Sequence, residues 1–397
     1  MNPLIFSNKR YFKLLFLILL SIDFYGLIPF EFLTNKLIQI IIYLPLFLIS
    51  YSQKKTEYHK NIFYLFIFLF FNYLSSYHYN NQSIIASFTS SIFIYHFTLF
   101  FLIFKLHPSI YEIEKVIKNI SFVGLILYFI QYIFISFPFI TSLTGWRSTS
   151  DNNVDLLRFG ISGEVIIILC FLMIINNIKN TRSIKSYVFT FGVIVMIILH
   201  GYRSIIFGFL GACLYLGIKK FKIKNTSKAL ALILVIFIIL FITIRLDFLK
   251  DSLDFMTSKN TQFNDENNSR IITFYYFYND YLHNIFEWIF GGGFLGNSEY
   301  GRHLNYIQEV GSIRYGKVNW VDLGFIGLSF IGGLLFTIQW IKLLLLNLRD
   351  VDSRYYYIGA FSIYLILSTL TLNIALTASS IAIQCLAFNM FYIIKNN

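Results

Sequence analysis

Residues 158–179 read RFGISGEVIIILCFLMIINNIK, and this stretch decides the fold class of the chain. An apolar run separates the charged Arg158 and Glu164 from Lys179, and about 20 such residues cross the hydrocarbon core of a bilayer. Similar runs recur along nearly the whole sequence. Charged residues make up only 13% of the chain, whereas soluble proteins carry about 25%. The composition therefore predicts a membrane protein.

We expect an all-α polytopic membrane protein with about twelve transmembrane helices, two large periplasmic loops and both termini in the cytoplasm. Residues 1–397 would form a single integral membrane domain. The predicted spans are 12–30, 37–52, 61–77, 83–104, 119–138, 161–178, 187–201, 204–218, 229–246, 321–346, 355–373 and 376–394.

Many of the lysines and several of the arginines fall on opposite sides of these spans. Lysine in short loops marks the cytoplasmic side, and that side carries Lys54, Lys55, Lys60, Lys115, Lys118, Lys179, Lys185, Lys219, Lys220, Lys222, Lys224 and Lys228. The opposite side carries Arg147, Arg158, Arg203, Arg245, Arg270, Arg302 and Arg314. Topology does not require arginine there. Because the planar guanidinium fork suits phosphate, pyrophosphate and carboxylate, the arginines indicate an anionic substrate handled on the outer face.

The formal net charge of +12 does not indicate binding to nucleic acid. A nucleic-acid site needs a continuous basic face, whereas the lysines of this chain are spread in small groups over many loops. We therefore exclude a nucleic-acid partner and attribute most of the charge to membrane topology.

Two long connections lie on the arginine side, at 139–160 and 247–320. The second is longer than two neighbouring helices need, and loops of this length are usually functional or disordered. Its many aromatic residues argue against disorder and predict an amphipathic helix in the membrane interface near 270–290. Gly291 and Gly293 follow this helix and predict a chain reversal. The chemistry should therefore lie on the same side as these two loops.

Three charged residues lie where predicted spans meet the outer side. Arg158 and Glu164 flank the end of the first loop, and a charged pair at a membrane boundary is costly unless it is partnered or used. The pair either anchors the helix end, or Arg158 binds an anionic head group while Glu164 orients it or acts as a base. Arg203 lies in a tight outer turn, where it either snorkels to the surface or reaches the site.

Further candidates lie in or just after the second loop. Arg270 opens the expected interfacial helix, and Arg302 and Arg314 follow the glycines. His303 is either solvated or catalytic, since it lies beside Arg302. Asp322 lies near the top of an apolar helix and needs a partner there. It is either the partner of a loop arginine or a reactive group.

This layout resembles the O-antigen polymerases (Wzy type), which belong to a wider group that includes the O-antigen ligases. The segment from Arg158 to Glu164 looks like the family's R-x-x-G-x-x-x-E pattern, with a spacing that is one residue shorter. Residues 199–204, which read LHGYRS, look like the family's SR turn, with Tyr202 where serine is common.

Two later segments add to the resemblance. Arg270, an aromatic stretch and the FGGG of residues 290–293 resemble the family's R…W…FGxG segment. Residues 319–322, which read NWVD, are followed by Gly324 and Gly327 and resemble its D…GxxG segment. The order and sidedness of all these patches carry the resemblance.

The resemblance implies a metal-independent glycosyltransferase of the bacterial inner membrane that needs no cofactor. It would move a growing glycan from undecaprenyl pyrophosphate to a hydroxyl of the next lipid-linked repeat unit. Membrane lipid and, optionally, a chain-length regulator would be further partners. The base would be His303, Glu164 or Asp322. Pyrophosphate and glycan would be bound by Arg147, Arg158, Arg203, Arg270, Arg302 and Arg314.

Two other functions stay open. An O-antigen ligase would use the same chemistry on lipid A core, although the ligase histidine usually lies just before a span, where this chain has Trp320 and Asp322. A flippase or transporter of lipid-linked oligosaccharide would bind its substrate near the bilayer midplane. The charges of this chain cluster instead in the outer loops, which favours the polymerase.

Overall fold

The fold is that of a computed structural model, which describes residues 8–27, 45, 56–134, 160–178, 183–200, 203–220, 273–274, 276–294, 320–370, 373 and 375–396. Of these residues, 84% are helical. The described part of the chain is therefore mostly helical.

Many of the helices are short, and several follow one another with little chain between them. The first half of the chain forms α1 (Asn8–Ser21), η1 (Asp23–Gly26), α3 (Glu57–Tyr79), α4 (Ile84–Ser90), η3 (Ile92–Thr98), α5 (Leu99–Leu106), α6 (Ile110–Ile133), α7 (Glu164–Asn176), α8 (Ile184–His200) and α9 (Arg203–Lys220). The second half forms the π-helix η5 (Tyr276–Tyr281), α13 (Ile285–Phe290), η6 (Trp320–Leu323), α15 (Phe325–Gly332), α16 (Leu334–Leu346), η7 (Ser353–Tyr355), α17 (Tyr356–Ser368) and α18 (Ala378–Asn396). Thr56 and Ser109 begin α3 and α6 with capping boxes, so polar residues between apolar runs set these helix starts.

The prediction of about twelve transmembrane helices is wrong. Within the described ranges, only α6 and α18 are long and apolar enough to cross a membrane, and the bent pair of α4 with η3–α5 makes a third if it counts as one span. Other apolar runs fold as shorter helices, among them α7, α8 and α16. The spans predicted at 37–52 and 229–246, and most of the loops predicted at 139–160 and 247–320, lie outside the described residues.

Helix breaks inside apolar runs explain part of this difference. The predicted span 321–346 contains two helices, because Gly333 has φ 90° and separates α15 from α16. The predicted span 83–104 bends by 65° between α4 and the 3-10 helix η3. A hydropathy average does not register one glycine or serine within an apolar run, so it treated each broken helix as continuous.

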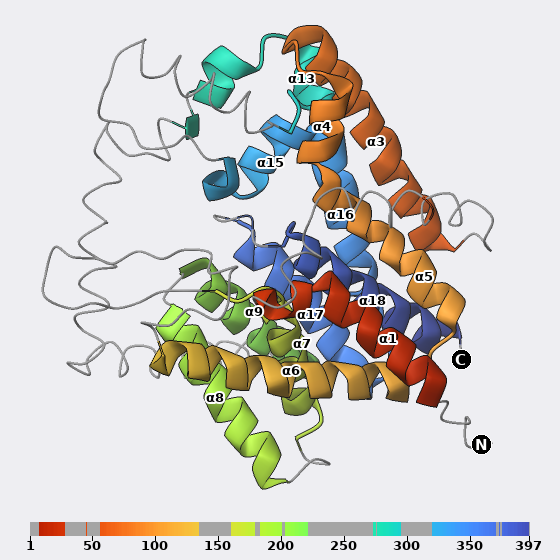
Figure 1. Cartoon of the computed structure of the whole chain (residues 1–397), viewed down its shortest axis with the longest axis vertical. Helices are drawn as coiled ribbons and strands as arrows, with labels where there is room; N and C mark the ends of the chain where they lie inside the picture. The colour runs from red at the N-terminus through yellow and green to blue at the C-terminus, as the bar shows by residue number, and fades with distance from the viewer. Residues whose placement is uncertain are drawn as a thin grey trace, which may run out of the picture.

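The helix ends form two groups at opposite ends of the bundle. α1 and α6 begin together, since Arg10 Nη1 donates to His107 O at 3.2 Å just before α6. α17 begins in the same place, where Tyr357 Oη donates to Glu114 Oε1 at 2.9 Å. In Figure 1, this end lies at the lower right, where the C-terminus and the beginning of α1 are close together.

Every described lysine lies in the helix half nearest this end, which we call the lysine end. The lysines are Lys9, Lys13, Lys60, Lys105, Lys115, Lys118, Lys185, Lys219, Lys220, Lys342 and Lys395. We call the opposite end the outer end. It holds the last turns of α3, α6 and α17 and the first turns of α7 and α9.

A short glycine segment, Gly291–Phe294, joins three helices at the outer end. Gly292 N donates to Phe330 O at 2.9 Å and Gly293 N to Ile331 O at 3.0 Å, so the segment runs along the end of α15. Asn72 of α3 donates from Nδ2 to Phe290 O and to Ile331 O, both at 2.7 Å. The expected chain reversal is present, since Gly291 and Gly293 both have positive φ.

In place of one interfacial helix near 270–290, the described part holds two short ones, η5 and α13. Asn284 divides them, because its Oδ1 accepts from Phe286 N at 2.9 Å and Glu287 N at 3.0 Å and so begins α13. Glu287 is fully buried and accepts hydrogen bonds from Asn80 Nδ2 at 3.0 Å and His283 N at 2.7 Å. These polar contacts hold the segment against the end of α3.

Gly291→Ala should lower the free energy of unfolding by about 2 kcal/mol or more, whereas Gly332→Ala should change it little. A Cβ on Gly291 would lie 2.2 Å from Ile331 O, at a φ of +87° that side chains avoid. A Cβ on Gly332 would meet side chains rather than backbone, the nearest being Phe336 at 3.2 Å. Thermal unfolding of the detergent-purified proteins measures both, and equal Tm values would contradict the described packing of the glycine segment.

Candidate active site

Most of the predicted site residues lie outside the described residues. These are Arg147, Arg158, Arg270, Arg302, His303 and Arg314. Arg203 and Asp322 are placed by their backbone alone, as the first residue of α9 and a residue of η6. Glu164 is described together with its side chain. Of the predicted set, the structure therefore relates Glu164, Arg203 and Asp322 to one another.

Glu164 is the first residue of α7 and lies at the outer end. Gly163 before it has φ 79°, and a Cβ there would lie 2.8 Å from the Cβ of Ile22, so the turn into α7 fits closely against the end of α1. The half-buried Glu164 carboxylate interacts electrostatically with Tyr128 of α6 and Tyr364 of α17. The carboxylate is therefore held between these two helices.

Arg203 begins α9, which runs antiparallel to α17. A Cβ on Gly208 would lie 2.7 Å from Tyr364 O, so the two backbones are in close contact near the outer end. Two turns further along α9, Tyr215 packs against α17 again, since its Oη would lie 2.7 Å from a Cβ on Gly359. This pairing places the first turn of α9 beside the last turn of α17.

Asp322 lies in η6, which is bonded to the same end of α17. Phe325 N donates to Thr369 O at 3.1 Å, and Asn373 N donates to Val321 O at 2.8 Å. The two bonds flank Asp322 on both sides. The backbone of Asp322 is therefore fixed next to the segment that follows α17.

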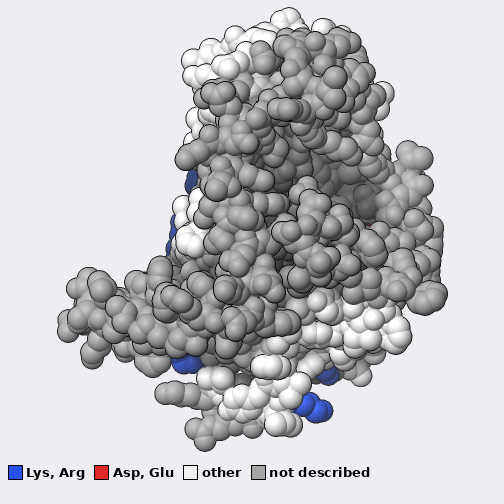
Figure 2. All heavy atoms as spheres, turned by 90° about the vertical axis from the view of Figure 1, so that its left-hand side faces the viewer, with Lys and Arg blue, Asp and Glu red and all other residues white. Residues whose placement is uncertain are grey.

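Glu164 and the backbones of Arg203 and Asp322 thus come from three separate parts of the chain and lie around residues 364–373, which we call the α17 terminus. α7 and α9 both begin here, and the first turn of a helix carries a partial positive charge that favours anions. Figure 2 views the molecule from the left-hand side of Figure 1; the described atoms on this face are mostly uncharged, and the visible Lys and Arg lie along its edges. The arrangement is suited to bind an anion and to transfer a proton.

The α17 terminus also contains two polar residues that the sequence did not single out. Tyr364 and Asn373 are only 1% and 4% exposed. In the described part of the chain, the Tyr364 hydroxyl and both amide atoms of Asn373 have no hydrogen-bond partner. Such groups destabilise a fold by about 1–3 kcal/mol each, which is typical of sites where a ligand supplies the partner. The one feature of the sequence that could have pointed to these two residues is that they are polar and lie in the second half of the apolar run 355–373.

Asp350 and Asp352 have the Asp-x-Asp spacing of metal-binding motifs, but they lie at the lysine end. Asp350 Oδ1 accepts from Lys219 Nζ at 3.0 Å, and Asp352 Oδ1 accepts from Arg354 N at 3.0 Å. Among the described residues, no group of three His, Cys, Asp or Glu side chains is placed to hold a metal ion. These two aspartates therefore serve an ion pair and a helix cap.

Comparison with protein-family models, curated proteins and solved structures finds no match for this chain. The site is thus characterised by its own residues. It consists of the half-buried Glu164, the start of α9 at Arg203 and the 3-10 helix η6 with Asp322. All three lie next to the α17 terminus.

Tyr364→Phe should leave the free energy of unfolding unchanged or raise it by up to about 1 kcal/mol, because it removes a buried hydroxyl that makes no hydrogen bond. Tyr58→Phe is the matched control and should lower it by about 1–2 kcal/mol, since Tyr58 Oη donates to Asn347 Oδ1 at 2.6 Å. Thermal unfolding of both purified variants measures the difference. An equal loss in both would mean that the Tyr364 hydroxyl is bonded within the fold.

Proposed function

We propose that this chain is a membrane glycosyltransferase that joins undecaprenyl-pyrophosphate-linked oligosaccharide repeat units, that is, a polysaccharide polymerase. The observation that carries the proposal is that Glu164 and the backbones of Arg203 and Asp322 lie near the α17 terminus, at the end of the bundle opposite the lysines. Transfer from a pyrophosphate needs these residue types. The proposal does not depend on the number of membrane spans.

The proposed reaction forms one glycosidic bond and breaks one bond to pyrophosphate. A hydroxyl of the next lipid-linked unit attacks the anomeric carbon of the growing glycan, and undecaprenyl pyrophosphate leaves with the bonding electrons. Arg203, at the positive end of α9, is suited to stabilise the charge on the leaving diphosphate. Glu164 or Asp322 is suited to accept the hydroxyl proton. His303, which lies outside the described residues, stays a third candidate for the base.

We place the lysine end in the cytoplasm and the outer end in the periplasm of a bacterial inner membrane. The support is the gathering of every described lysine at one end, because lysine marks the cytoplasmic side of membrane proteins. The arginines of the loops would then approach the site from the periplasm. Membrane lipid, the lipid-linked oligosaccharide and, optionally, a chain-length regulator are the partners that this location provides.

Transport of a lipid-linked oligosaccharide is the second candidate, because two broken helices meet at the outer end. Transporters often bind their substrates through the backbone groups that such breaks release. Here, the protein itself satisfies several of these groups. Asn72 Nδ2 donates to Ile331 O at 2.7 Å, and Gly292 N donates to Phe330 O at 2.9 Å. We therefore rank transport below polymerisation.

Deleting the chain from its host and examining the lipopolysaccharide ladder tests the proposed function. Core that carries a single repeat unit is the expected result, since ligation and flipping would both still work. Core without any repeat unit would contradict a polymerase and leave a ligase or a flippase. The side of the membrane on which the lipid-linked glycan accumulates then separates these two.

Arg203→Lys and Glu164→Gln should each slow chain extension by about 10²-fold or more, because one loses the bidentate fork and the other a carboxylate at the site. Arg354→Lys is the matched control, since this exposed arginine lies at the lysine end. Glycan length in the complemented deletion strain is the measurement, with protein amount checked in the membrane fraction. Wild-type length with both site variants would contradict the assigned roles.

A further inference from the structure

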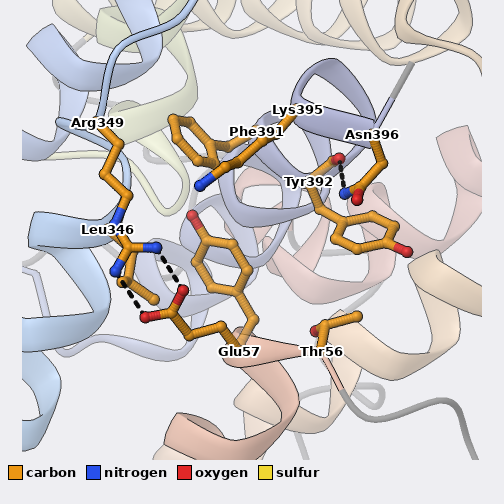
Figure 3. Close-up of a pocket in the computed structure, with 9 residues that line it drawn as sticks. Thr56, Glu57, Leu346, Arg349, Phe391, Tyr392, Lys395 and Asn396 are labelled. Carbon is orange, nitrogen blue, oxygen red and sulfur yellow. Dashed lines mark hydrogen bonds and ion pairs between the residues drawn. The ribbon is translucent and has the colours of Figure 1, made fainter.

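A cavity of about 300 Å³ opens at the lysine end, between the beginning of α3 and the ends of α16 and α18 (Figure 3). Its lining includes Glu57, Tyr58, Arg349, Phe391 and Lys395. α18 extends from this cavity towards the outer end over 19 residues, which is about 28 Å of helix. The cavity is therefore separate from the candidate active site.

An ion pair forms one wall of the cavity. Arg349 binds both carboxylate oxygens of Glu57, through Nη1 to Oε2 and through Nη2 to Oε1 at 2.7 Å. The hydrogen bond from Arg349 lowers the pKa of Glu57, and the nearby Lys395 and Lys342 lower it further. The carboxylate therefore stays ionised at neutral pH. Three cations surround this one anion, so the charge around the cavity is net positive.

Lys395 supplies a second cation that the fold leaves available. Figure 3 shows its ammonium group pointing into the cavity, towards Arg349. Within the described part of the chain, Lys395 has no hydrogen bond or ion pair to an acceptor. A guanidinium has five N–H groups, and the bidentate pair with Glu57 uses two of them. Arg349 and Lys395 together can therefore hold oxygens of one further anion.

Apolar side chains continue from the cavity along the surface of the bundle. Tyr58 and Phe391 line the cavity with ring centroids 6.3 Å apart, but they are only 4% and 2% exposed and belong to the core behind it. Beside them, Phe63 and Tyr64 of α3 are 41% and 47% exposed, and Leu345 of α16 is 47% exposed. Large exposed apolar side chains at a membrane surface suit contact with acyl chains. The combination of cations and apolar surface is the one that an anionic phospholipid requires.

We propose that this cavity binds the phosphate group of an anionic phospholipid from the leaflet on the lysine side. Lys395 and the remaining N–H groups of Arg349 hold the phosphate oxygens, while the exposed Phe63, Tyr64 and Leu345 contact the acyl chains. The Glu57 pair fixes the plane of the guanidinium. A soluble phosphate has the same binding chemistry, but it would leave the apolar surface beside the cavity without a ligand.

Lys395→Gln tests the proposal, with Lys9→Gln as the control because Lys9 is exposed at the same end and does not line the cavity. The full-length protein is purified in a neutral detergent and titrated with phosphatidylglycerol or phosphatidylcholine while its Tm is measured. Phosphatidylglycerol should raise the Tm of the wild type and of Lys9→Gln, and phosphatidylcholine should not. Lys395→Gln should weaken the apparent affinity for phosphatidylglycerol about tenfold or more, as expected for the loss of one charge-assisted hydrogen bond.

Equal responses of Lys395→Gln and Lys9→Gln to phosphatidylglycerol would overturn the site. A parallel titration with inorganic phosphate separates the two sources of phosphate. A Tm response to inorganic phosphate that requires Lys395, without a response to the lipid, would overturn the assignment to phospholipid. The Tm of each variant without added lipid reports folding. The test is independent of the proposed polymerase activity, since it measures no glycan.

Discussion

The break between α15 and α16 leaves backbone groups without partners in their own helix, and the arrangement of the outer end depends on supplying those partners. In an apolar bundle, each backbone N–H and C=O that a helix break releases needs a partner within the protein. Asn72 reaches the carbonyls of Phe290 and Ile331, and the glycine segment donates to the end of α15. These bonds tie α3, α13 and α15 together. η6, directly before α15, then lies where its own backbone can bond to the α17 terminus.

The two ends of the bundle use charge in different ways. At the lysine end, the pairs Arg349–Glu57 and Lys219–Asp350 are exposed, and exposed pairs contribute only about 0–1 kcal/mol each. Their main contribution is to orient side chains. At the outer end, the half-buried Glu164 lies among tyrosines, where interactions between charges are less screened than in water.

The sequence could predict features that depend on local residue type, and it could not predict those that depend on packing. The one-sided distribution of lysines and the reversal at Gly291 and Gly293 are both present in the structure. The break at Gly333 was missed, because a hydropathy average does not respond to one residue. Glu164 and Arg203 were singled out by their charge alone. That they meet depends on the close packing of α9 against α17 at Gly208, which no spacing in the sequence reveals.

The contact between α9 and α17 has a mechanical consequence. The two helices touch at Gly208 near one end and at Gly359 near the other, with no space for either backbone to slide past the other. α17 has 13 residues and so acts as a stiff rod of about 20 Å. Its far end is attached to Glu114 through Tyr357. α17 therefore joins the outer end to the lysine end as one stiff element, so neither end of it can shift without the other.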